Sequence, residues 1–457
     1  MSDYITATLV KARTAGAHPA ELAALRRRLK QLAEPQAGQL AGSDLRPLDD
    51  LPRLDDLPEP PTEQARQVLD RLTVLKLNGG LGTTMGLSGP KSLLQAKPGQ
   101  TFLDISATQV LALRQRYRAR LPLVLMNSPT TRQPSIELLH RYAGLRDQAG
   151  VVPLDFLQGR EPKLRQSDLL PVAWPQNPEL EWCPPGHGDL YTSLAASGLL
   201  SALLAAGMRW CFVSNSDNLG ALPDTRLAAW VAAEGVPFAM EAVRGTPADR
   251  KGGHLALDQG RIVLRESAQV PDGDLSFSDV ERWRFYNTNN LWIDLKALHD
   301  LQAADPSAPV LPLIVNHKTV DPADATSTPV IQLETAMGAA IGSIPHARAV
   351  EVPRRRFVPV KTTDDLLVVR SDAYELTPDG EVRPTFDGVG PVVSLDRDSF
   401  GLLQHFEQRF AAGPPSLRRC TSLRVEDDVT FGADVVCEGA VRVSGRRHVP
   451  DGQLLRG

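Results

Sequence analysis

Residues 74–92 read VLKLNGGLGTTMGLSGPKS, and this stretch decides the fold class. Its apolar beginning predicts a short buried strand that ends at Leu77. The five glycines that follow have no Cβ, so the loop can turn tightly and present backbone N–H groups to an anion. Lys91 closes the loop with a compact positive charge suited to the same anion. The stretch therefore predicts an anion-binding loop at the end of a central strand.

The glycines of this loop follow neither of two common phosphate-binding patterns. No Gly-Lys-Ser/Thr ending makes it a P-loop, and the glycine spacing differs from the dinucleotide fingerprint. Their order instead resembles the L-x-G-G-x-G-[ST]-x-x-G-x-x-x-P-K signature of nucleotide-sugar pyrophosphorylases. The wording K-L-N-G-G-L-G-T-x-M-G is similar to that of the UTP–glucose-1-phosphate uridylyltransferases of the eukaryotic type. A cluster of turns without chemistry is the alternative interpretation, which the length of the match disfavours.

Composition and charge describe an ordinary globular chain. Its 457 residues, 42% of them hydrophobic, are enough for two or three compact units. A net charge of −4 gives no electrostatic footprint for nucleic acid or for a membrane surface. We therefore expect no nucleic-acid or membrane partner, and local basic pockets for phosphorylated small molecules.

Cysteine usage and the N-terminus bear on the compartment. The four cysteines form no C-x-x-C pair and lack histidines at zinc spacing. Among them, Cys211 lies in an apolar strand candidate, where a buried thiol is expected. The N-terminus lacks a basic region followed by an apolar one, and no apolar run approaches ~18 residues. These features predict a cytoplasmic protein.

Residues 1–70 are expected to form an N-terminal helical segment followed by a linker. Helix formers dominate 5–40, where leucines recur at helical spacing at positions 22, 25, 29 and 32. Pro, Asp and Leu then dominate 44–62. We interpret this stretch as a linker that either wraps along the rest of the protein or acts as a spacer. The sequence assigns no chemistry to this region.

Residues 71–360 are expected to form the catalytic domain, in which apolar strands alternate with helices. The strand candidates are Thr73–Leu77, Pro122–Met126, Trp210–Ser214, Pro237–Ala242 and Asn290–Ile293. The helix candidates are Asp104–Arg118, Ser135–Tyr142, Asp189–Ala206 and Thr225–Glu234. Such alternation favours an α/β fold with a largely parallel sheet covered on both faces. The family resemblance implies a Rossmann-like nucleotidyltransferase (GT-A-like) fold, with a mixed sheet flanked by helices.

Three polar loops are expected to meet at one edge of this sheet, because ligands of such folds bind beyond the carboxyl ends of the strands. They are the glycine loop after Leu77, Asn127-Ser128 and the loop Asn215–Gly220. Their convergence indicates a substrate site more strongly than any one loop does.

Residues 361–457 are expected to form a C-terminal domain. Between 420 and 452, short apolar pairs recur between Gly and Asp, as in Leu423–Val425 and Val429–Phe431. Strands this short suggest the coils of a left-handed parallel β-helix, which the resemblance also implies. A small β-meander is the alternative.

The resemblance implies a reversible exchange of UTP and glucose 1-phosphate for UDP-glucose and pyrophosphate. The sugar phosphate is already a nucleophile and attacks the UTP α-phosphate directly, so no general base is needed. The protein must bring two polyanions together and stabilise charge in the transition state. Lys91, against the triphosphate, and Lys361, between the α-phosphate and the sugar phosphate, are the expected catalytic residues.

Lys361 is identified from residues 354–366, RRRFVPVKTTDDL, which match the family's P-R-x-R-F-x-P-V-K-T-x-x-D-L from its first arginine onward. We interpret the neighbouring arginines as scaffold ion pairs on a solvated face.

Mg²⁺ is the expected cofactor, with Asp217 as its ligand. Residues 213–220, VSNSDNLG, leave an apolar strand with one carboxylate and are similar to the family's S-N-x-D-N-L-G. Magnesium often takes only one or two carboxylates and keeps several waters. The resemblance places Asn215 near the sugar or the phosphates. A helix cap is the alternative role for Asp217.

The nucleotide is expected to contact the start of the glycine loop. The resemblance implies that the contacts come from Leu77, Asn78, Gly79 and Gly80, with main-chain groups offered to the uracil edge and the phosphates. Met126 is expected to pack against the base, and core packing is its alternative role.

Two further segments belong to the nucleotide side. Gln158 matches the family glutamine that reads the uracil edge, where an amide can pair with an imide. In residues 184–189, PPGHGD, the resemblance places Gly186 at the uracil and His187 toward the phosphates. Asp189 suits the N-cap of the following helix.

The hexose side is assigned by resemblance alone. The segments that resemble the hexose pocket contain Gly253, Glu266, Asn287 and Asn289. The stretch 332–335, QLET, is also similar to the family. For Glu334, a structural role is the alternative to a role in the site.

Two rival functions share the same loop and metal site. One is a pyrophosphorylase for UDP-N-acetylhexosamine or for several UDP-sugars, although K-L-N-G-G and N-T-N-N-L-W favour glucose. The other is a non-catalytic nucleotide-sugar-binding regulator, which loss of Lys91, Lys361 or Asp217 would mark, and all three residues are present.

The chain departs from the family pattern in two places. Ser88 stands where the family often has a basic residue. The chain also stops before the last strands of animal members, so we expect a monomer or a small homo-oligomer.

Overall fold

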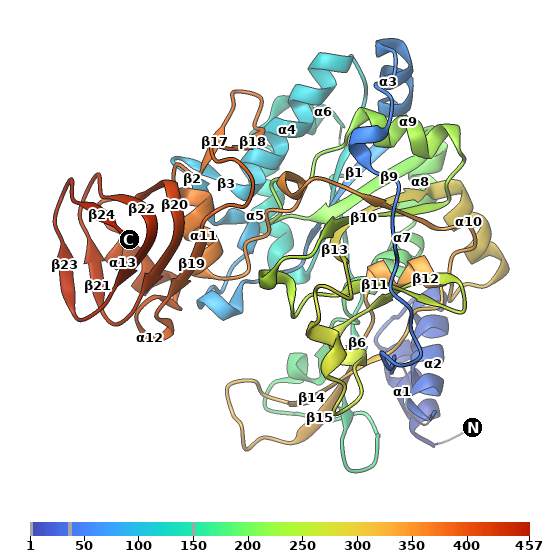
Figure 1. Cartoon of the computed structure of the whole chain (residues 1–457). Helices are drawn as coiled ribbons and strands as arrows, with labels where there is room; N and C mark the ends of the chain where they lie inside the picture. Colours follow the sequence, from blue (N-terminus) through green and yellow to red (C-terminus); the bar gives the residue numbers. More distant parts are fainter. Residues whose placement is uncertain (1–2, 35–38, 149–150) are drawn as a thin grey trace.

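The computed structural model describes residues 3–34, 39–148 and 151–457, and they form a mixed α/β fold around a nine-stranded sheet (Figure 1). The strand order is β12-β11-β13-β9-β1-β4-β5, and β10 pairs with both β13 and β16. The strands are β1 (Leu72–Asn78), β4 (Leu123–Asn127), β5 (Asp155–Leu157), β9 (Trp210–Asn215), β10 (Phe238–Arg244), β11 (His254–Asp258), β12 (Arg261–Arg265), β13 (Phe285–Asp294) and β16 (Arg348–Glu351).

Four neighbouring strands, β9, β1, β4 and β5, run parallel. Every residue of β4 is buried because a hydrophobic cluster fills each face of the sheet, as expected for parallel strands between two helical layers. One cluster is lined by α7 (Leu190–Ala196), α8 (Leu199–Ala205) and α10 (Leu295–Ala304). The other is lined by α3 (Thr62–Leu69), α4 (Phe102–Tyr117), α5 (Pro129–Leu139), α6 (Ala143–Gln148) and α9 (Thr225–Ala233).

The other half of the sheet is mostly antiparallel. β13 pairs antiparallel with β9, β10 and β11, and β11 pairs antiparallel with β12. The sheet is therefore mixed, as the family resemblance implies. The expectation of a largely parallel sheet is correct for β5, β4, β1 and β9 and for the β10–β16 pair, and wrong for the rest.

The predicted strands of this domain are all present, but some boundaries differ. β13 begins at Phe285 and not at Asn290. The helix expected from Ser135 begins at Pro129, because Ser128 caps it by accepting a hydrogen bond from the Thr131 N–H. The helix expected over 189–206 is two helices, α7 and α8, separated at Gly198, whose φ of +76° is left-handed.

The N-terminal region contains two helices, α1 (Asp3–Thr14) and α2 (Pro19–Leu32). Residues 35–38 of the expected helical segment lie outside the described residues. The region 39–61 wraps along the catalytic domain, as one of the two interpretations predicts, with Leu48, Leu51 and Leu54 buried. Single β-bridges join Arg46 to Leu257 and Arg53 to Glu351, so this region is attached to the sheet at two points.

The C-terminal strands pair in parallel. β19 (Val392–Leu395), β20 (Ser416–Val425), β22 (Val436–Val443) and β24 (Leu454–Arg456) form one sheet, and β21 (Val429–Phe431) pairs with β23 (Arg447–Val449). An antiparallel β-meander is therefore wrong. Successive layers repeat after 18 residues, as in the hydrogen bond from the Ala433 N–H to Asp451.

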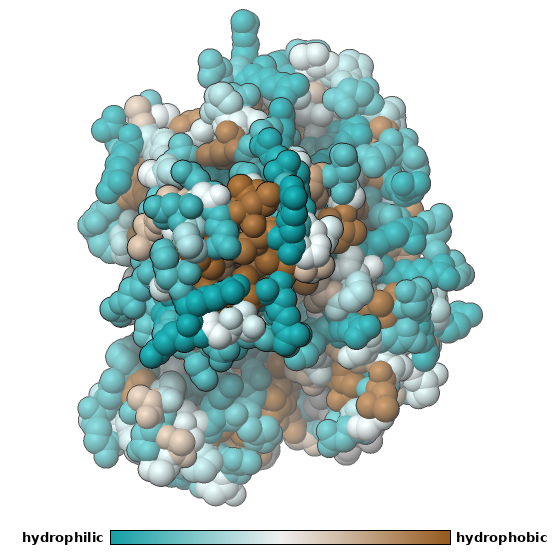
Figure 2. All heavy atoms as spheres, turned by 60° about the vertical axis from the view of Figure 1, so that its left-hand side comes forward, coloured by the Kyte–Doolittle hydropathy of each residue, from teal (hydrophilic) through white to brown (hydrophobic). Residues whose placement is uncertain are grey.

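The hydrophobic core of this C-terminal region is continuous with the glycine-loop side of the catalytic domain. Met85, Phe102 and Leu219 belong to the same buried cluster as Leu423 and Phe431. This side of the molecule is mainly hydrophilic on its surface, and an apolar area at its centre is bordered by long hydrophilic side chains (Figure 2).

Shorter elements complete the described chain. Strands β14 (Ile314–Thr319), β15 (Pro329–Glu334) and β7 (Leu164–Arg165) form a small sheet, and three two-stranded ribbons pair β2 (Gln95–Lys97) with β3 (Gln100–Thr101), β6 (Glu161–Pro162) with β8 (Trp182–Cys183), and β17 (Tyr374–Leu376) with β18 (Val382–Pro384). The remaining helices are α11 (Thr363–Arg370), α12 (Arg397–Phe400) and α13 (Leu403–Arg409).

Among the described helices, none has the length and apolar character to cross a membrane. All four cysteines are free and buried.

Candidate functional site

The register of the parallel strands brings the first group of predicted residues to one edge of the sheet. Leu77 pairs with Met126 on one side and with Asn215 on the other, and Asn78 pairs with Asn127. All these residues occupy the last two positions of their strands, so the loops that follow start side by side. The predicted convergence of loops at this edge is confirmed.

The glycine loop turns back on itself beyond β1. Gly82 and Gly86 have φ of +63° and +74°, in the left-handed region that glycine adopts without strain. The Lys91 N–H donates to the Gly80 carbonyl oxygen at 3.1 Å, which closes the loop. The lysine side chain is thereby held above the strand ends.

Lys91 contacts the predicted metal ligand directly. Its Nζ donates to Oδ2 of Asp217 at 2.6 Å, and each side chain is 15% exposed. One ammonium group and one carboxylate thus form an accessible pair of opposite charges at the sheet edge. Nothing binds the Asp217 side chain into a helix cap among the described contacts, so its alternative role has no support.

Gln158 joins this group from the end of β5. Its N–H donates to the Asn127 carbonyl oxygen at 2.8 Å, and a Cβ added to Gly79 would lie 2.7 Å from its Oε1. The amide of Gln158 therefore lies directly against the start of the glycine loop. A side chain at position 79 would displace it.

Two predicted nucleotide contacts have side chains that are committed elsewhere. Nδ2 of Asn78 donates to Oδ1 of Asn127 at 2.7 Å and to Oγ of Ser135 at 2.8 Å. Only the main chain of Asn78 is therefore available to contact a ligand. Met126 is 2% exposed and packs in the hydrophobic cluster on one face of the sheet, which is its alternative role.

Gly186 and His187 lie against the loop that follows β15. Gly186 has φ of +77°, and a Cβ there would lie 2.6 Å from the Thr335 carbonyl oxygen, so another residue would collide with backbone. Nδ1 of His187 accepts from the Met337 N–H at 3.0 Å. That acceptor role leaves the proton of a neutral ring on Nε2, free to be donated to an anion.

Asp189 has a different role from the one expected. It occupies the N-cap position of α7 but makes no capping hydrogen bond. Its Oδ2 instead accepts from the Gly159 N–H at 2.6 Å and from Oγ of Ser193. The carboxylate therefore links the segment of Gln158 to the segment of His187.

The predicted hexose residues form a second group. A Cβ on Gly253 would lie 2.6 Å from Oε2 of Glu266, and the Asn287 N–H donates to the Gly253 carbonyl oxygen at 2.9 Å. Nδ2 of Asn287 donates to Oδ1 of Asn289 at 2.8 Å. Burial raises the pKa of Glu266, and the nearby positive charge of Lys361 opposes that rise. Lys361 itself is exposed, and it is near enough for its positive charge to act on Glu266.

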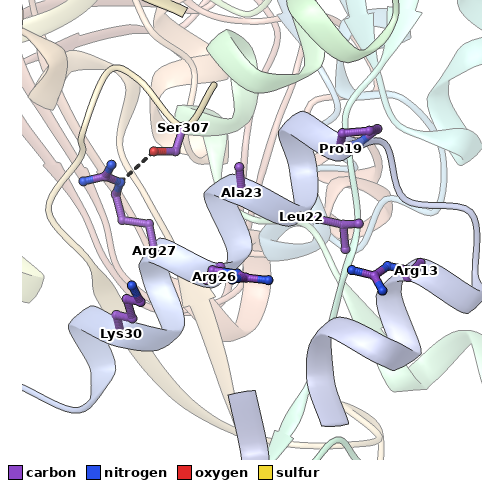
Figure 3. Close-up of a pocket in the computed structure, with 8 residues that line it drawn as sticks. All are labelled: Arg13, Pro19, Leu22, Ala23, Arg26, Arg27, Lys30 and Ser307. Carbon is purple, nitrogen blue, oxygen red and sulfur yellow. Dashed lines mark hydrogen bonds between the residues drawn. The ribbon is translucent and has the colours of Figure 1, made fainter. Parts of the chain in front are cut away.

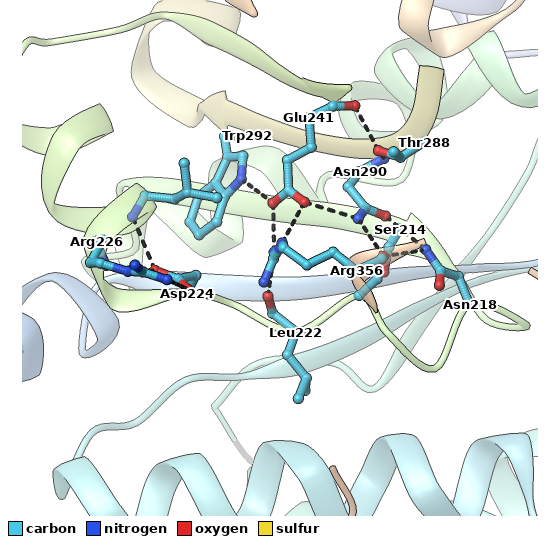
Figure 4. A network of polar contacts seen from close by, with 12 residues as sticks. Ser214, Asn218, Leu222, Asp224, Arg226, Glu241, Thr288, Asn290, Trp292 and Arg356 are labelled. Atoms are coloured by element: carbon cyan, nitrogen blue, oxygen red, sulfur yellow. Dashed lines mark hydrogen bonds and ion pairs between the residues drawn. The ribbon is translucent and has the colours of Figure 1, made fainter. Parts of the chain in front are cut away.

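Sequence reasoning missed a buried ion pair that joins these groups (Figure 4). Arg356 donates from Nε and Nη2 to the two carboxylate oxygens of Glu241 at 2.8 and 2.6 Å, and the two side chains are 8% and 0% exposed. Arg356 was expected on a solvated face, and that interpretation is wrong for it, because its side chain turns into the core and pairs there with the buried Glu241 carboxylate. It remains correct for Arg354, whose pair with Asp249 is 41% exposed on the arginine side.

The ion pair connects the loop of Asp217 to the segment of Lys361. Asn218 donates from Nδ2 to the Arg356 carbonyl oxygen at 3.2 Å and accepts from the Val358 N–H at 2.9 Å. Nη2 of Arg356 also donates to the Leu222 carbonyl oxygen at 2.7 Å. These hydrogen bonds fix the distance between the loop of Asp217 and the segment that carries Lys361.

Lys76 supports the same loop and was also missed. Its side chain is fully buried under the strand ends, where Nζ donates to Oγ of Ser214 at 2.8 Å and to the Ala221 carbonyl oxygen at 3.0 Å. Burial lowers the pKa of Lys76 to about 7. A lysine inside an apolar strand was the signal that could have found it.

A metal held by protein groups alone has no support in residues 3–34, 39–148 and 151–457. No group of three or more His, Cys, Asp or Glu side chains there could hold an ion. Asp217 is therefore suited only to a cation that also takes ligands from a substrate or from water.

A hollow of about 660 Å³ lies elsewhere, on the outer side of α1 and α2 (Figure 3). Arg13, Arg26, Arg27 and Lys30 line it, and none of the predicted site residues does. It is therefore separate from the candidate site at the strand ends.

Comparison with known proteins gives consistent matches. The chain matches the family model described as UTP–glucose-1-phosphate uridylyltransferase over residues 25–438. It is 40% identical to the proteins of that name from Musa acuminata and Solanum tuberosum, over 88% of this chain and 85% and 83% of those proteins. A mutant UDP-glucose pyrophosphorylase of Leishmania major in complex with UDP-glucose has a TM-score of 0.94 and 40% identity, covering 100% of this chain and 98% of that one. A UDP-glucose phosphorylase of Trypanosoma brucei has a TM-score of 0.86 and 40% identity, covering 100% of both chains.

Removing Arg356 should be much more costly than removing Arg354. Arg356→Ala leaves the Glu241 carboxylate buried without its partner, which typically costs about 3–5 kcal/mol. Arg354→Ala removes an arginine that is 41% exposed, and the buried Asp249 carboxylate keeps its hydrogen bonds from Thr246, so a smaller loss of about 1 kcal/mol is expected. Urea unfolding of the two variants measures the difference. Equal losses of stability would show that the buried pair has no special structural weight.

Proposed function

The chain belongs to the UTP–glucose-1-phosphate uridylyltransferase family, and on this premise we propose that it transfers a uridylyl group from UTP to glucose 1-phosphate. The products are UDP-glucose and pyrophosphate, and the reaction is reversible. The contact between Lys91 and Asp217 at the carboxyl edge of the sheet carries this proposal, because it provides the two charges that a nucleoside triphosphate with a divalent cation requires.

The chemistry needs position and charge more than proton transfer. A phosphate oxygen of glucose 1-phosphate attacks the α-phosphorus of UTP, and the bond from that phosphorus to the pyrophosphate oxygen breaks. Lys91 neutralises the departing pyrophosphate. Lys361 lies between the α-phosphate and the sugar phosphate, where negative charge accumulates in the transition state. Fixed charges of this kind stabilise a transition state without reorganisation.

The residues present fit Mg²⁺ as a cofactor. Asp217 is an accessible carboxylate beside Asn215, and Mg²⁺ in phosphoryl-transfer sites is usually held by one or two carboxylates together with substrate phosphates. When bound, the ion supplies positive charge to the phosphates. The Lys91 contact uses only Oδ2 of Asp217, so Oδ1 would be available to hold the cation beside an ammonium group that binds phosphate.

The remaining residues recognise the two ends of the product. Gln158, which lies against Gly79, reads the uracil edge. The Gly186 backbone contacts the base. His187 donates from Nε2 toward the phosphates. Gly253, Glu266, Asn287 and Asn289 line the hexose, with the Gly253 position kept free of a side chain beside the Glu266 carboxylate.

Two rival functions predict different substrates. A pyrophosphorylase for UDP-N-acetylhexosamine or for several UDP-sugars would use the same charges with another sugar pocket. A non-catalytic nucleotide-sugar-binding regulator would bind without turnover. The presence of Lys91, Asp217 and Lys361 favours an enzyme, and the solved complex of the Leishmania major relative with UDP-glucose favours glucose.

We extend the proposal to the organisation of the chain. Residues 71–360 are the catalytic domain, and 361–457 are a C-terminal domain whose parallel sheets with an 18-residue repeat form a short left-handed β-helix. The protein acts as a monomer or a small homo-oligomer. Four free cysteines support a reducing compartment such as the cytoplasm.

Pyrophosphate release tests the proposed activity. The protein, UTP and Mg²⁺ are combined with glucose 1-phosphate, galactose 1-phosphate or N-acetylglucosamine 1-phosphate. We expect the highest kcat/KM with glucose 1-phosphate. A preference for the N-acetylated sugar would establish the first rival, and binding of UDP-glucose without pyrophosphate release the second.

Lys361→Ala should lower kcat by at least ~100-fold, the scale for loss of one preorganised charge stabiliser. Steady-state kinetics measure it, with Lys296→Ala as the control, because Lys296 pairs with Asp300 on the surface of α10. A change of less than threefold would remove Lys361 from the catalytic set.

Asp217→Ala should abolish the dependence of activity on Mg²⁺ concentration in the range where the unaltered protein responds, because the cation loses its protein ligand. A magnesium titration of initial rates measures this. Asp398→Ala, which removes an exposed carboxylate of α12, is the control. If the Asp217→Ala titration matches that of the unaltered protein, Asp217 is not the ligand.

A further inference from the structure

The N-terminal helices contact the nucleotide side of the site through a buried ion pair. Arg28 of α2 donates from Nε and Nη2 to Oε2 of Glu161 at 3.0 and 2.6 Å. The two side chains are 8% and 3% exposed. Glu161 follows Gln158 by only three residues, so the pair anchors the segment that carries the proposed reader of uracil.

Glu161 also touches the second segment of the nucleotide side. It belongs to β6, which pairs antiparallel with β8 in the register Glu161–Cys183. Cys183 precedes Gly186 by three residues. A single short ribbon therefore connects Gln158 with Gly186 and His187, and Arg28 holds this ribbon at its centre.

Helix α1 makes a second attachment to the same ribbon. Nζ of Lys11 donates to Oε2 of Glu181 and to the Val172 carbonyl oxygen, each at 2.5 Å. Oε1 of Glu181 accepts from the Trp174 N–H at 2.7 Å. The strand that leads to Gly186 is thus tied to α1, as the other strand is tied to α2.

The Arg28–Glu161 pair is poorly explained as a source of stability. Oε1 of Glu161 is buried and has no hydrogen-bond partner among the described residues, which carries a desolvation cost. Burial raises the pKa of Glu161 to about 7. Since an apolar pair of similar size is often as stable as a buried ion pair, a positional role accounts better for these two residues.

We propose that the N-terminal helices are part of the uridine site, with Arg28 and Lys11 as positioning residues that set the distance between Gln158 and the Gly186–His187 segment. This inference rests on the proposed function, which assigns base recognition to those segments. It gives a role to the region to which the sequence assigned no chemistry.

The test compares Arg28→Met with Arg27→Met. Arg27 is the preceding residue of α2, but its guanidinium group bonds Asp305 and Ser307, beside the hollow in Figure 3, and not the ribbon. Arg28→Met should raise KM for UTP on the order of tenfold, because Gln158 and the Gly186–His187 segment lose their fixed spacing, with KM for glucose 1-phosphate changed less than about twofold. Arg27→Met should change neither constant.

Base discrimination separates positioning from general destabilisation. The ratio of kcat/KM for UTP to that for CTP should fall in Arg28→Met, because uracil and cytosine differ at the edge that Gln158 reads. If this variant does not fold, Arg28→Met/Glu161→Leu removes both charges without leaving one unpaired, and the same result is expected.

Unchanged KM for UTP and unchanged discrimination in a folded variant would overturn the inference. The proposed function fails in a different way, since the unaltered protein would then release no pyrophosphate from UTP and glucose 1-phosphate.

Discussion

Parallel strands place their carboxyl ends at one edge of a sheet, and the candidate site depends on this constraint. The register of β1 with β4 and β9 aligns Leu77, Met126 and Asn215, so the three following loops leave from a common line. The Lys91–Asp217 contact is possible only because of that alignment, since the two residues are 126 positions apart in the chain. A shift of one residue in either ladder would turn the alternate side chains to the opposite face.

Charged groups buried beneath this edge hold the loops in place. Lys76 supports the loop after β9, the Glu241–Arg356 pair joins that loop to the segment of Lys361, and the Arg28–Glu161 pair reaches the nucleotide side. Buried charges are costly, and three sets of them around one site indicate that position is retained at some expense of stability. Two repelling phosphorylated substrates require such fixed surroundings.

The terminal regions contribute to the same site from opposite sides. The N-terminal helices contact the ribbon of β6 and β8. The C-terminal core includes Met85 of the glycine loop and Leu219 of the Asp217 loop. The domain boundaries predicted from the sequence therefore do not separate the terminal regions from the site. Each region restrains one of its loops.

The sequence by itself determined the strand–loop pattern of 74–92, the family resemblance and the residues at the strand ends, because local hydrophobicity and glycine spacing are written in consecutive positions. Periodicity placed most strands within a few residues, but it missed the break at Gly198 and the early start of α5, which depend on a left-handed φ and a capping hydrogen bond. Only the tertiary structure decided that the Asn78 side chain is committed to the core, that Asp189 bridges to Gly159, and that Arg356 and Arg28 are buried. Each of these depends on a partner distant in sequence, and a local pattern carries no information about which distant carboxylate a side chain will meet.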